Sequence, residues 1–209
     1  MKKFICETKN LSKKYKDFYA LKNVNLTIPK GEIYGLVGEN GAGKTTLIRL
    51  LTGLNFKSEG EIILFGHQDN LQHERSKIGC TIEMPALYKD MTASQNLEVQ
   101  RIQRGIPNKK CIADTLELIG LSNAGKKRVA NFSLGMKQRL ALGVALLGEP
   151  EFLILDEPVN GLDPTGIIEL RELLKKLVKE REVTILISSH ILSCLLYTSD
   201  AADDRISVD

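Results

Sequence analysis

Apolar residues recur along the chain with two periods, which predict different elements. Strands are predicted, from alternation or from short continuous apolar runs, at 24–28, 33–37, 61–65, 152–155 and 183–187. Helices are predicted, from apolar residues at helical spacing, at 44–51, 111–119, 134–147 and 167–178, with a further helix start at 92–97. Because strands alternate with helices, we expect an α/β fold with a mainly parallel sheet and a helical insertion at about residues 85–150.

A glycine-rich segment links the predicted strand 33–37 to the predicted helix 44–51. It fits the pattern G-x-x-x-x-G-K-[ST], in which small residues let backbone N–H groups surround phosphate oxygens at a helix N-terminus. Lys44 would reach the β- and γ-phosphates, and Thr45 would offer its hydroxyl to Mg²⁺. The alternative is a glycine turn with a chance lysine. The candidate nucleotide-binding residues here are Gly38, Asn40, Gly41, Gly43, Lys44, Thr45 and Thr46.

Two adjacent carboxylates, Asp156 and Glu157, follow the predicted strand 152–155. A carboxylate at the end of a buried strand suits Mg²⁺, directly or through water, so Asp156 is a candidate metal ligand. Glu157 would then lie beside the γ-phosphate and could polarise an attacking water. The alternative is that the pair only caps a strand.

A third segment, Ser133–Arg139, opens the predicted helix 134–147. A serine at this place is common for local reasons, because its hydroxyl caps a helix. The segment nevertheless resembles the signature motif of the ABC ATPases, although Leu134 and Met136 replace the usual glycine and glutamine. The resemblance implies that Ser133 and Gly135 close on the γ-phosphate bound by the opposite subunit of a dimer.

Other positions match the same family. By resemblance, Tyr15 stacks on adenine, Asp163 belongs to the loop that crosses the dimer interface, and His190 contacts the γ-phosphate. Glu83 stands where the family has a glutamine that touches Mg²⁺ and the attacking water, and a carboxylate can still bind the metal. The alternatives are an ordinary surface tyrosine at Tyr15, a structural histidine at His190 and a solvated loop residue at Glu83.

The resemblance covers residues 2–193 and implies a fold and a function. The expected fold is a P-loop NTPase core with an N-terminal antiparallel β subdomain and a helical insertion. The expected activity is Mg²⁺-dependent ATP hydrolysis by a homodimer that drives a transmembrane permease. Residues 78–88 with the signature are most similar to the bacitracin- and lantibiotic-type exporters. Two alternatives stay open: an ABC ATPase of DNA repair or translation, and a nucleotide-dependent module that does not hydrolyse ATP.

Composition adds a few exclusions. The 209 residues are 43% hydrophobic, and the net charge of +3 is too small to indicate nucleic acid binding. No apolar run approaches the ~18 residues that span a bilayer, and the start lacks the apolar core of a signal peptide. We therefore expect a cytoplasmic protein, peripheral on the inner face of the cell membrane through its permease. Four cysteines have neither metal nor redox spacing.

The last sixteen residues differ from the rest. Residues 194–204 correspond to the translation of a transposon-end sequencing adapter, and 194–209 carry four aspartates against one arginine. We therefore expect an ABC ATPase domain at 1–193, truncated at its C-terminus, and a non-native tail at 194–209. The alternative is a genuine, divergent end. Amplification of the source DNA distinguishes them, since adapter codons would be missing from the genome.

Overall fold

The computed structural model describes residues 4–82, 87–190 and 205–207. The predicted metal ligand Glu83 lies outside the described residues. The same holds for all of the expected tail except 205–207. The α/β class and the two kinds of sheet predicted from the sequence are confirmed.

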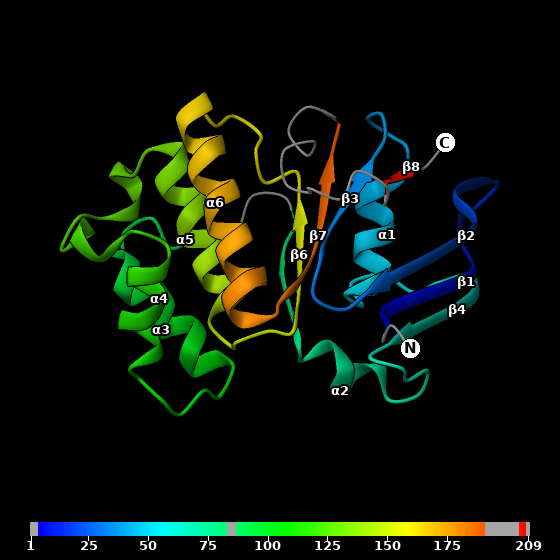
Figure 1. The fold of residues 1–209 in the computed structure, drawn as a ribbon, viewed down its shortest axis with the longest axis horizontal. Coiled ribbons are helices and arrows are strands. Elements are labelled where there is room, and N and C mark those ends of the chain that lie inside the picture. Colours follow the sequence, from blue (N-terminus) through cyan, green and yellow to red (C-terminus); the bar gives the residue numbers. More distant parts are fainter. Residues whose placement is uncertain (1–3, 83–86, 191–204, 208–209) are drawn as a thin grey trace.

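A parallel sheet forms the centre of the molecule (Figure 1), with the strand order β5-β6-β7-β3-β8. Its strands are β3 (Ile33–Val37), β5 (Ile78–Thr81), β6 (Phe152–Asp156), β7 (Thr184–Ser189) and β8 (Arg205–Ser207). The predicted strand 33–37 matches β3 at both ends, and the predicted strands 152–155 and 183–187 became β6 and β7 with ends that differ by one or two residues. The short β8 pairs in parallel with β3. This pairing does not test the origin of the tail, which stays a prediction.

A smaller antiparallel sheet, with the order β2-β1-β4, packs beside the first. Its strands are β1 (Phe4–Tyr15), β2 (Phe18–Pro29) and β4 (Glu59–Leu64). The pairing of β1 with β2 shifts register at several points, between Thr8 and Leu11 among others. These irregularities interrupt the period of two, which is why the sequence pattern did not predict β1.

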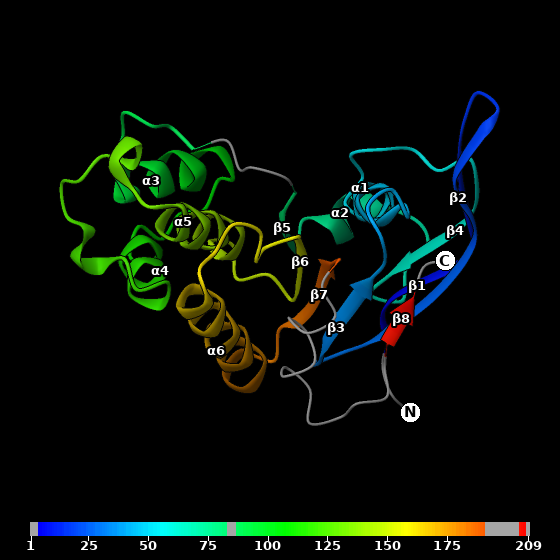
Figure 2. The same ribbon diagram turned by 90° about the horizontal axis from the view of Figure 1, so that it is seen from above.

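The helices divide into two groups, as Figure 2 shows from above: α1 and α2 on one side of the parallel sheet, α3 to α6 on the other. Their bounds are α1 (Lys44–Leu51), α2 (Leu71–Arg75), α3 (Ala93–Gln103), α4 (Cys111–Leu118), α5 (Leu134–Leu146) and α6 (Pro164–Arg181), with short 3₁₀ turns η1 (Ser122–Ala124) and η2 (Val129–Asn131). Among the described residues, no helix is both long and apolar enough to cross a bilayer. The helices α3, α4 and α5 fall within the expected insertion at about 85–150, whose boundaries stay a prediction.

Strand β6 connects two hydrophobic clusters, because successive side chains of a strand point to opposite faces. Phe152 and Ile154 pack in the cluster formed with α1 and the antiparallel sheet. Leu153 and Leu155 pack in the cluster formed with α5, α6 and β7. All four side chains are at most 1% exposed. Burial on both faces explains the continuous apolar run and fixes the strand whose end carries Asp156.

Close packing of β5 against α5 gives a prediction about stability. A Cβ atom on Gly79 would overlap the carbonyl oxygen of Ala145 and lie 2.9 Å from Cγ of Pro150. We expect Gly79→Ala to cost about 1–3 kcal/mol through overpacking, which lowers Tm by several degrees. Differential scanning calorimetry measures this. Gly148→Ala is the matched control, because a Cβ atom there meets nothing within 4 Å; equal Tm values for both variants would contradict the prediction.

Candidate active site

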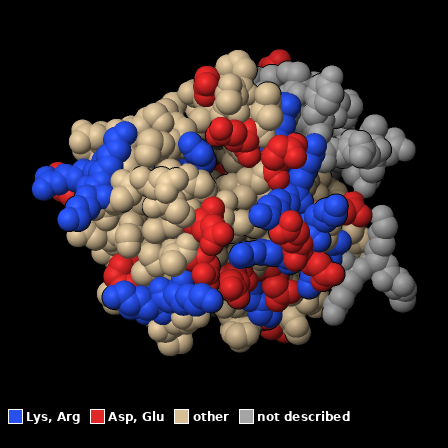
Figure 3. Space-filling view, turned by 60° about the vertical axis from the view of Figure 1, so that its left-hand side comes forward, with Lys and Arg blue, Asp and Glu red and all other residues tan. Residues whose placement is uncertain are grey.

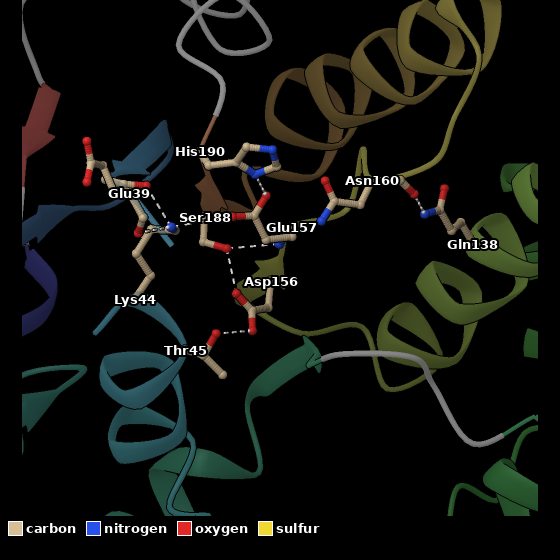
Figure 4. A network of polar contacts seen from close by, with 10 residues as sticks. Glu39, Lys44, Thr45, Gln138, Asp156, Glu157, Asn160, Ser188 and His190 are labelled. Atoms are coloured by element: carbon tan, nitrogen blue, oxygen red, sulfur yellow. Dashed lines mark hydrogen bonds and ion pairs between the residues drawn. The ribbon is translucent and has the colours of Figure 1, made fainter. Parts of the chain in front are cut away.

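Three strand ends of the parallel sheet meet at one edge (Figure 4). The glycine-rich loop follows β3, Asp156 and Glu157 lie at the end of β6, and His190 follows β7. Since β7 lies between β3 and β6 in a parallel sheet, the carboxyl ends of all three strands open on the same side. Ligands of open α/β sheets bind at this edge.

The glycine-rich loop holds a buried cation at the start of α1. Gly43 has a φ of 89° and caps the helix, and a Cβ atom there would lie 2.6 Å from the carbonyl oxygen of Ala20. The Lys44 ammonium donates hydrogen bonds to the carbonyl oxygens of Gly38 (2.7 Å) and Glu39 (3.0 Å) and is only 6% exposed. A cation beside a helix N-terminus is an anion-binding arrangement.

Thr45 and Asp156 come together across the site. The Thr45 hydroxyl donates a 2.8 Å hydrogen bond to Oδ2 of Asp156. Asp156 is 8% exposed. A hydroxyl and a carboxylate are hard oxygen ligands of the kind that Mg²⁺ prefers. The donor set of this pair therefore fits the metal that the sequence predicts.

Glu157 has a strained backbone and a carboxylate that lies between two side chains. Its φ of 49° lies in the left-handed region, which costs a residue other than glycine about 1–2 kcal/mol. Its carboxylate lies 2.8 Å from Nδ1 of His190 and 3.5 Å from Nζ of Lys44. The Glu157 side chain is 19% exposed, so water can reach the carboxylate. The arrangement suits a group that orients a water molecule and accepts its proton.

Ser133, Gly135 and Asp163 lie at a different cleft. Ser133 caps α5 by accepting a hydrogen bond from the Met136 N–H, and Asp163 caps α6 by accepting one from the Gly166 N–H, both at 3.2 Å. The cleft has a volume of about 450 Å³, and its described lining includes no residue of the glycine-rich loop. The structure therefore does not bring these residues to Lys44 within one chain.

Tyr15 ends β1 and is 46% exposed. Its hydroxyl accepts a hydrogen bond from Nδ2 of Asn55 (2.9 Å), and the Lys13 ammonium lies 4.7 Å from its ring centroid. An anchored, exposed aromatic ring offers a flat surface to a base.

Two residues with contacts in this region were not predicted from the sequence. Ser188, on β7, donates a hydrogen bond to Oδ1 of Asp156 (2.6 Å) and accepts one from the Glu157 N–H (2.8 Å). Gln138, on α5, donates to the carbonyl oxygen of Asn160 (2.7 Å), in the segment that follows Glu157. The available signal for Ser188 was a hydroxyl two residues before His190 at the end of an apolar strand.

Two of the cysteines that the structure describes, Cys6 and Cys80, are unsuited to nucleophilic chemistry. Burial raises the pKa of the Cys6 thiol to about 12, and burial also raises the pKa of Cys80. Cys80 lies on β5, whose partner strand β6 carries Asp156. Because the thiolate is the reactive form, neither thiol supplies it near neutral pH.

Charges of both signs are interspersed on the molecular face that Figure 3 draws. Lysine and arginine side chains gather at the left and lower left of this view and are mixed with aspartate and glutamate side chains on its right, and a broad uncharged area lies between. On this face the pattern differs from the continuous basic stripe that is typical of nucleic acid-binding proteins.

Comparison with known proteins places the geometry in context. Residues 21–160 match the family described as ABC transporter. The bacitracin transport ATP-binding protein BcrA of Enterococcus faecalis is 45% identical over 91% of the chain, and the chain spans 62% of its length. The lantibiotic transport ATP-binding protein SrtF of Streptococcus pyogenes is 47% identical, over 91% of the chain and 82% of its own length.

The fold also matches solved structures. One is the dimeric, post-hydrolysis structure of the ATP-binding cassette MJ0796 bound to ADP and Pi. Its TM-score is 0.79 at 29% sequence identity, and the match covers 90% of this chain and 89% of that chain.

Proposed function

Because the chain belongs to the ABC transporter family of ATP-binding proteins, we propose that it binds and hydrolyses ATP to power a membrane transporter. The main support for the proposal is that Lys44, Asp156 and Glu157 lie near one another at one edge of the parallel sheet. These three groups are a cation for phosphate, a carboxylate for a metal and a carboxylate for water.

Binding begins at the glycine-rich loop. The β- and γ-phosphates displace Lys44 from its contacts with the carbonyl oxygens of Gly38 and Glu39, and the N-terminus of α1 adds positive potential. Tyr15 stacks on the adenine ring, with Asn55 fixing its hydroxyl. Gly41, with a φ of 92°, and Asn40 shape the loop around the phosphates.

Thr45 and Asp156 would hold Mg²⁺, since their oxygens already lie 2.8 Å apart. When bound, the metal neutralises charge that develops on the phosphate oxygens. Glu83 would add a third oxygen ligand from outside the described residues.

Glu157 orients the attacking water and accepts its proton. His190 fixes one carboxylate oxygen at 2.8 Å, which leaves the other oxygen directed toward Lys44 and the phosphate. Little covalent chemistry falls to the protein in phosphoryl transfer, so positioning and charge account for catalysis.

We propose that two copies share each nucleotide. Ser133 and Gly135 lie in a different cleft from the glycine-rich loop of their own chain. They are at the N-terminus of α5, which would bind the γ-phosphate held by a second copy. The dimeric form of MJ0796, a cassette of the same fold, supports this arrangement. Asp163 lines the same cleft and would lie at the interface.

The names of the relatives indicate the process that hydrolysis drives. BcrA and SrtF are named for bacitracin and lantibiotic transport, so we propose export of a peptide antibiotic or a similar amphipathic compound. The dimer would act on a transmembrane permease at the cytoplasmic face of the membrane and reach the membrane only through that partner. The relatives' names favour this function over DNA repair or translation.

Removal of the metal tests the proposal directly. We expect the purified chain to release phosphate from ATP with Mg²⁺ present and to lose this activity when EDTA removes the metal. Without the metal, the neutral Thr45 and the anionic Asp156 offer the phosphates no positive charge. A coupled phosphate assay measures the rate. Added Mg²⁺ should restore it. Absence of phosphate release with Mg²⁺, or undiminished release in EDTA, would contradict the proposed activity.

A further inference from the structure

We propose that Ser188 is a positioning residue, which sets the orientation of the carboxylate of Asp156 and the backbone of Glu157 at the same time. The inference rests on the proposed ATP hydrolysis. It assigns a role to a side chain that lies outside the sequence motifs from which ATP hydrolysis is predicted. Its basis is a pair of hydrogen bonds between β7 and the end of β6.

The sheet register brings Ser188 to this place. Ser188 is the register partner of Asp156 in the parallel pair of β6 and β7, and Leu36 of β3 is its partner on the other side. Ser188 is 0% exposed, so its hydroxyl can be satisfied only from within the protein. The hydroxyl donates to the Asp156 carboxylate and accepts from the Glu157 N–H, so it is satisfied in both roles. Figure 4 shows the hydroxyl between the two acidic residues.

On Asp156, Ser188 sets the direction in which the carboxylate group points. The hydroxyl donates to Oδ1 at 2.6 Å, so Oδ2 is left to face Thr45 at 2.8 Å. This hydrogen bond restrains the carboxylate from rotating away from the Thr45 side. Loss of the hydroxyl frees this rotation and should weaken the hold on Mg²⁺.

On Glu157, Ser188 stabilises an unfavourable backbone conformation. The residue has a φ of 49°, and its N–H is held by the Ser188 hydroxyl at 2.8 Å. Strained residues at functional sites persist because neighbouring contacts hold them. Without this contact the turn can relax, and the carboxylate then leaves the position between His190 and Lys44.

The test compares Ser188→Ala with the matched control Thr184→Val. Thr184 is also 0% exposed on β7, and its hydroxyl also accepts a 2.8 Å bond from a backbone N–H, that of Gly31, but at the opposite end of the strand. Both variants remove one buried hydroxyl, so both should lose similar thermal stability. Only Ser188→Ala should affect the site.

Two readouts are expected to change. In Ser188→Ala, kcat for ATP should fall about tenfold or more, while affinity for a fluorescent ATP analogue without metal stays within about threefold. The Mg²⁺ concentration for half-maximal change in the analogue's fluorescence should rise about threefold or more. Ser188→Thr keeps the hydroxyl on a residue suited to strands, so its kcat and its Mg²⁺ dependence should both lie close to those of the wild-type chain.

The outcomes separate the two proposals. If the wild-type chain does not hydrolyse ATP, the proposed function fails, and the shift in Mg²⁺ dependence still decides the role of Ser188. If the wild-type chain hydrolyses ATP but Ser188→Ala matches it in both readouts, or Thr184→Val loses as much activity, the role of Ser188 is overturned and the function stands.

Discussion

Glu157→Gln should abolish most ATP turnover while leaving nucleotide binding intact. An amide has nearly the shape of the carboxylate and can keep contacts with His190 and Lys44, but it cannot accept a proton from water. General-base groups of this kind contribute about 10²–10⁴ in rate, so we expect a fall of that order in kcat. Phosphate release measures turnover, and fluorescence titration with an ATP analogue measures binding.

A matched control exists at the other end of the same strand. Glu149 precedes β6, is exposed and has a φ of 48°, close to the 49° of Glu157. Glu149→Gln makes the same charge change in a similar backbone conformation, away from the site, and should leave kcat unchanged. Equal turnover in Glu157→Gln and wild type would refute the proposed base.

The same variant makes the shared nucleotide site observable. With hydrolysis blocked, ATP should hold two copies together, because in the proposed dimer each γ-phosphate would contact Lys44 of one chain and Ser133 of the other. Light scattering after size-exclusion chromatography should detect a dimer of Glu157→Gln with ATP and a monomer without it. Adding Ser133→Arg, which fills the approach to the phosphate, should restore the monomer. A variant that stays monomeric with ATP would exclude the sharing proposed for Ser133 and Gly135.

Sequence periodicity predicted the elements in which the pattern of buried positions is regular. Strand β6 is buried on both faces, so its apolar run is continuous and was predicted nearly to the residue. Strand β1 was not predicted, because register shifts break its alternation and its neighbours β2 and β4 supply the pairing. Helix α2 spans only Leu71–Arg75, which is too short for a helical period to show in the sequence.

The site was predictable where its chemistry lies within one short segment. The phosphate loop is one continuous segment, and the two carboxylates are neighbours in a second segment. Lys44, Asp156 and Glu157 could therefore be named from the sequence, although their roles stay predictions. The contribution of Ser188 depends on its register with Asp156, and register between distant strands is not visible in one sequence. The positive φ of Glu157 was equally hidden, since positive φ is normally associated with glycine.

Lys44→Ala should weaken nucleotide binding itself, and turnover with it. The Lys44 ammonium is buried at 6% exposure and is the cation held against both the loop carbonyls and Glu157. Hydrogen bonds to charged groups contribute about 1.5–3 kcal/mol, so affinity for ATP should fall about ten- to hundredfold. Turnover should fall further, because in the proposed mechanism Lys44 would also neutralise charge that develops in the transition state. Isothermal titration calorimetry measures affinity, and phosphate release measures turnover.

The pattern of loss distinguishes Lys44 from Glu157. Lys44→Ala should lose affinity and ATP-dependent dimerisation together, whereas Glu157→Gln should keep both and lose turnover alone. Lys176→Ala is the control for loss of a lysine, because its ammonium is exposed on α6 and lies 3.9 Å from Glu180. If Lys44→Ala binds ATP as tightly as Lys176→Ala does, the phosphate is not bound at this loop, and the site built around β3, β6 and β7 is wrong.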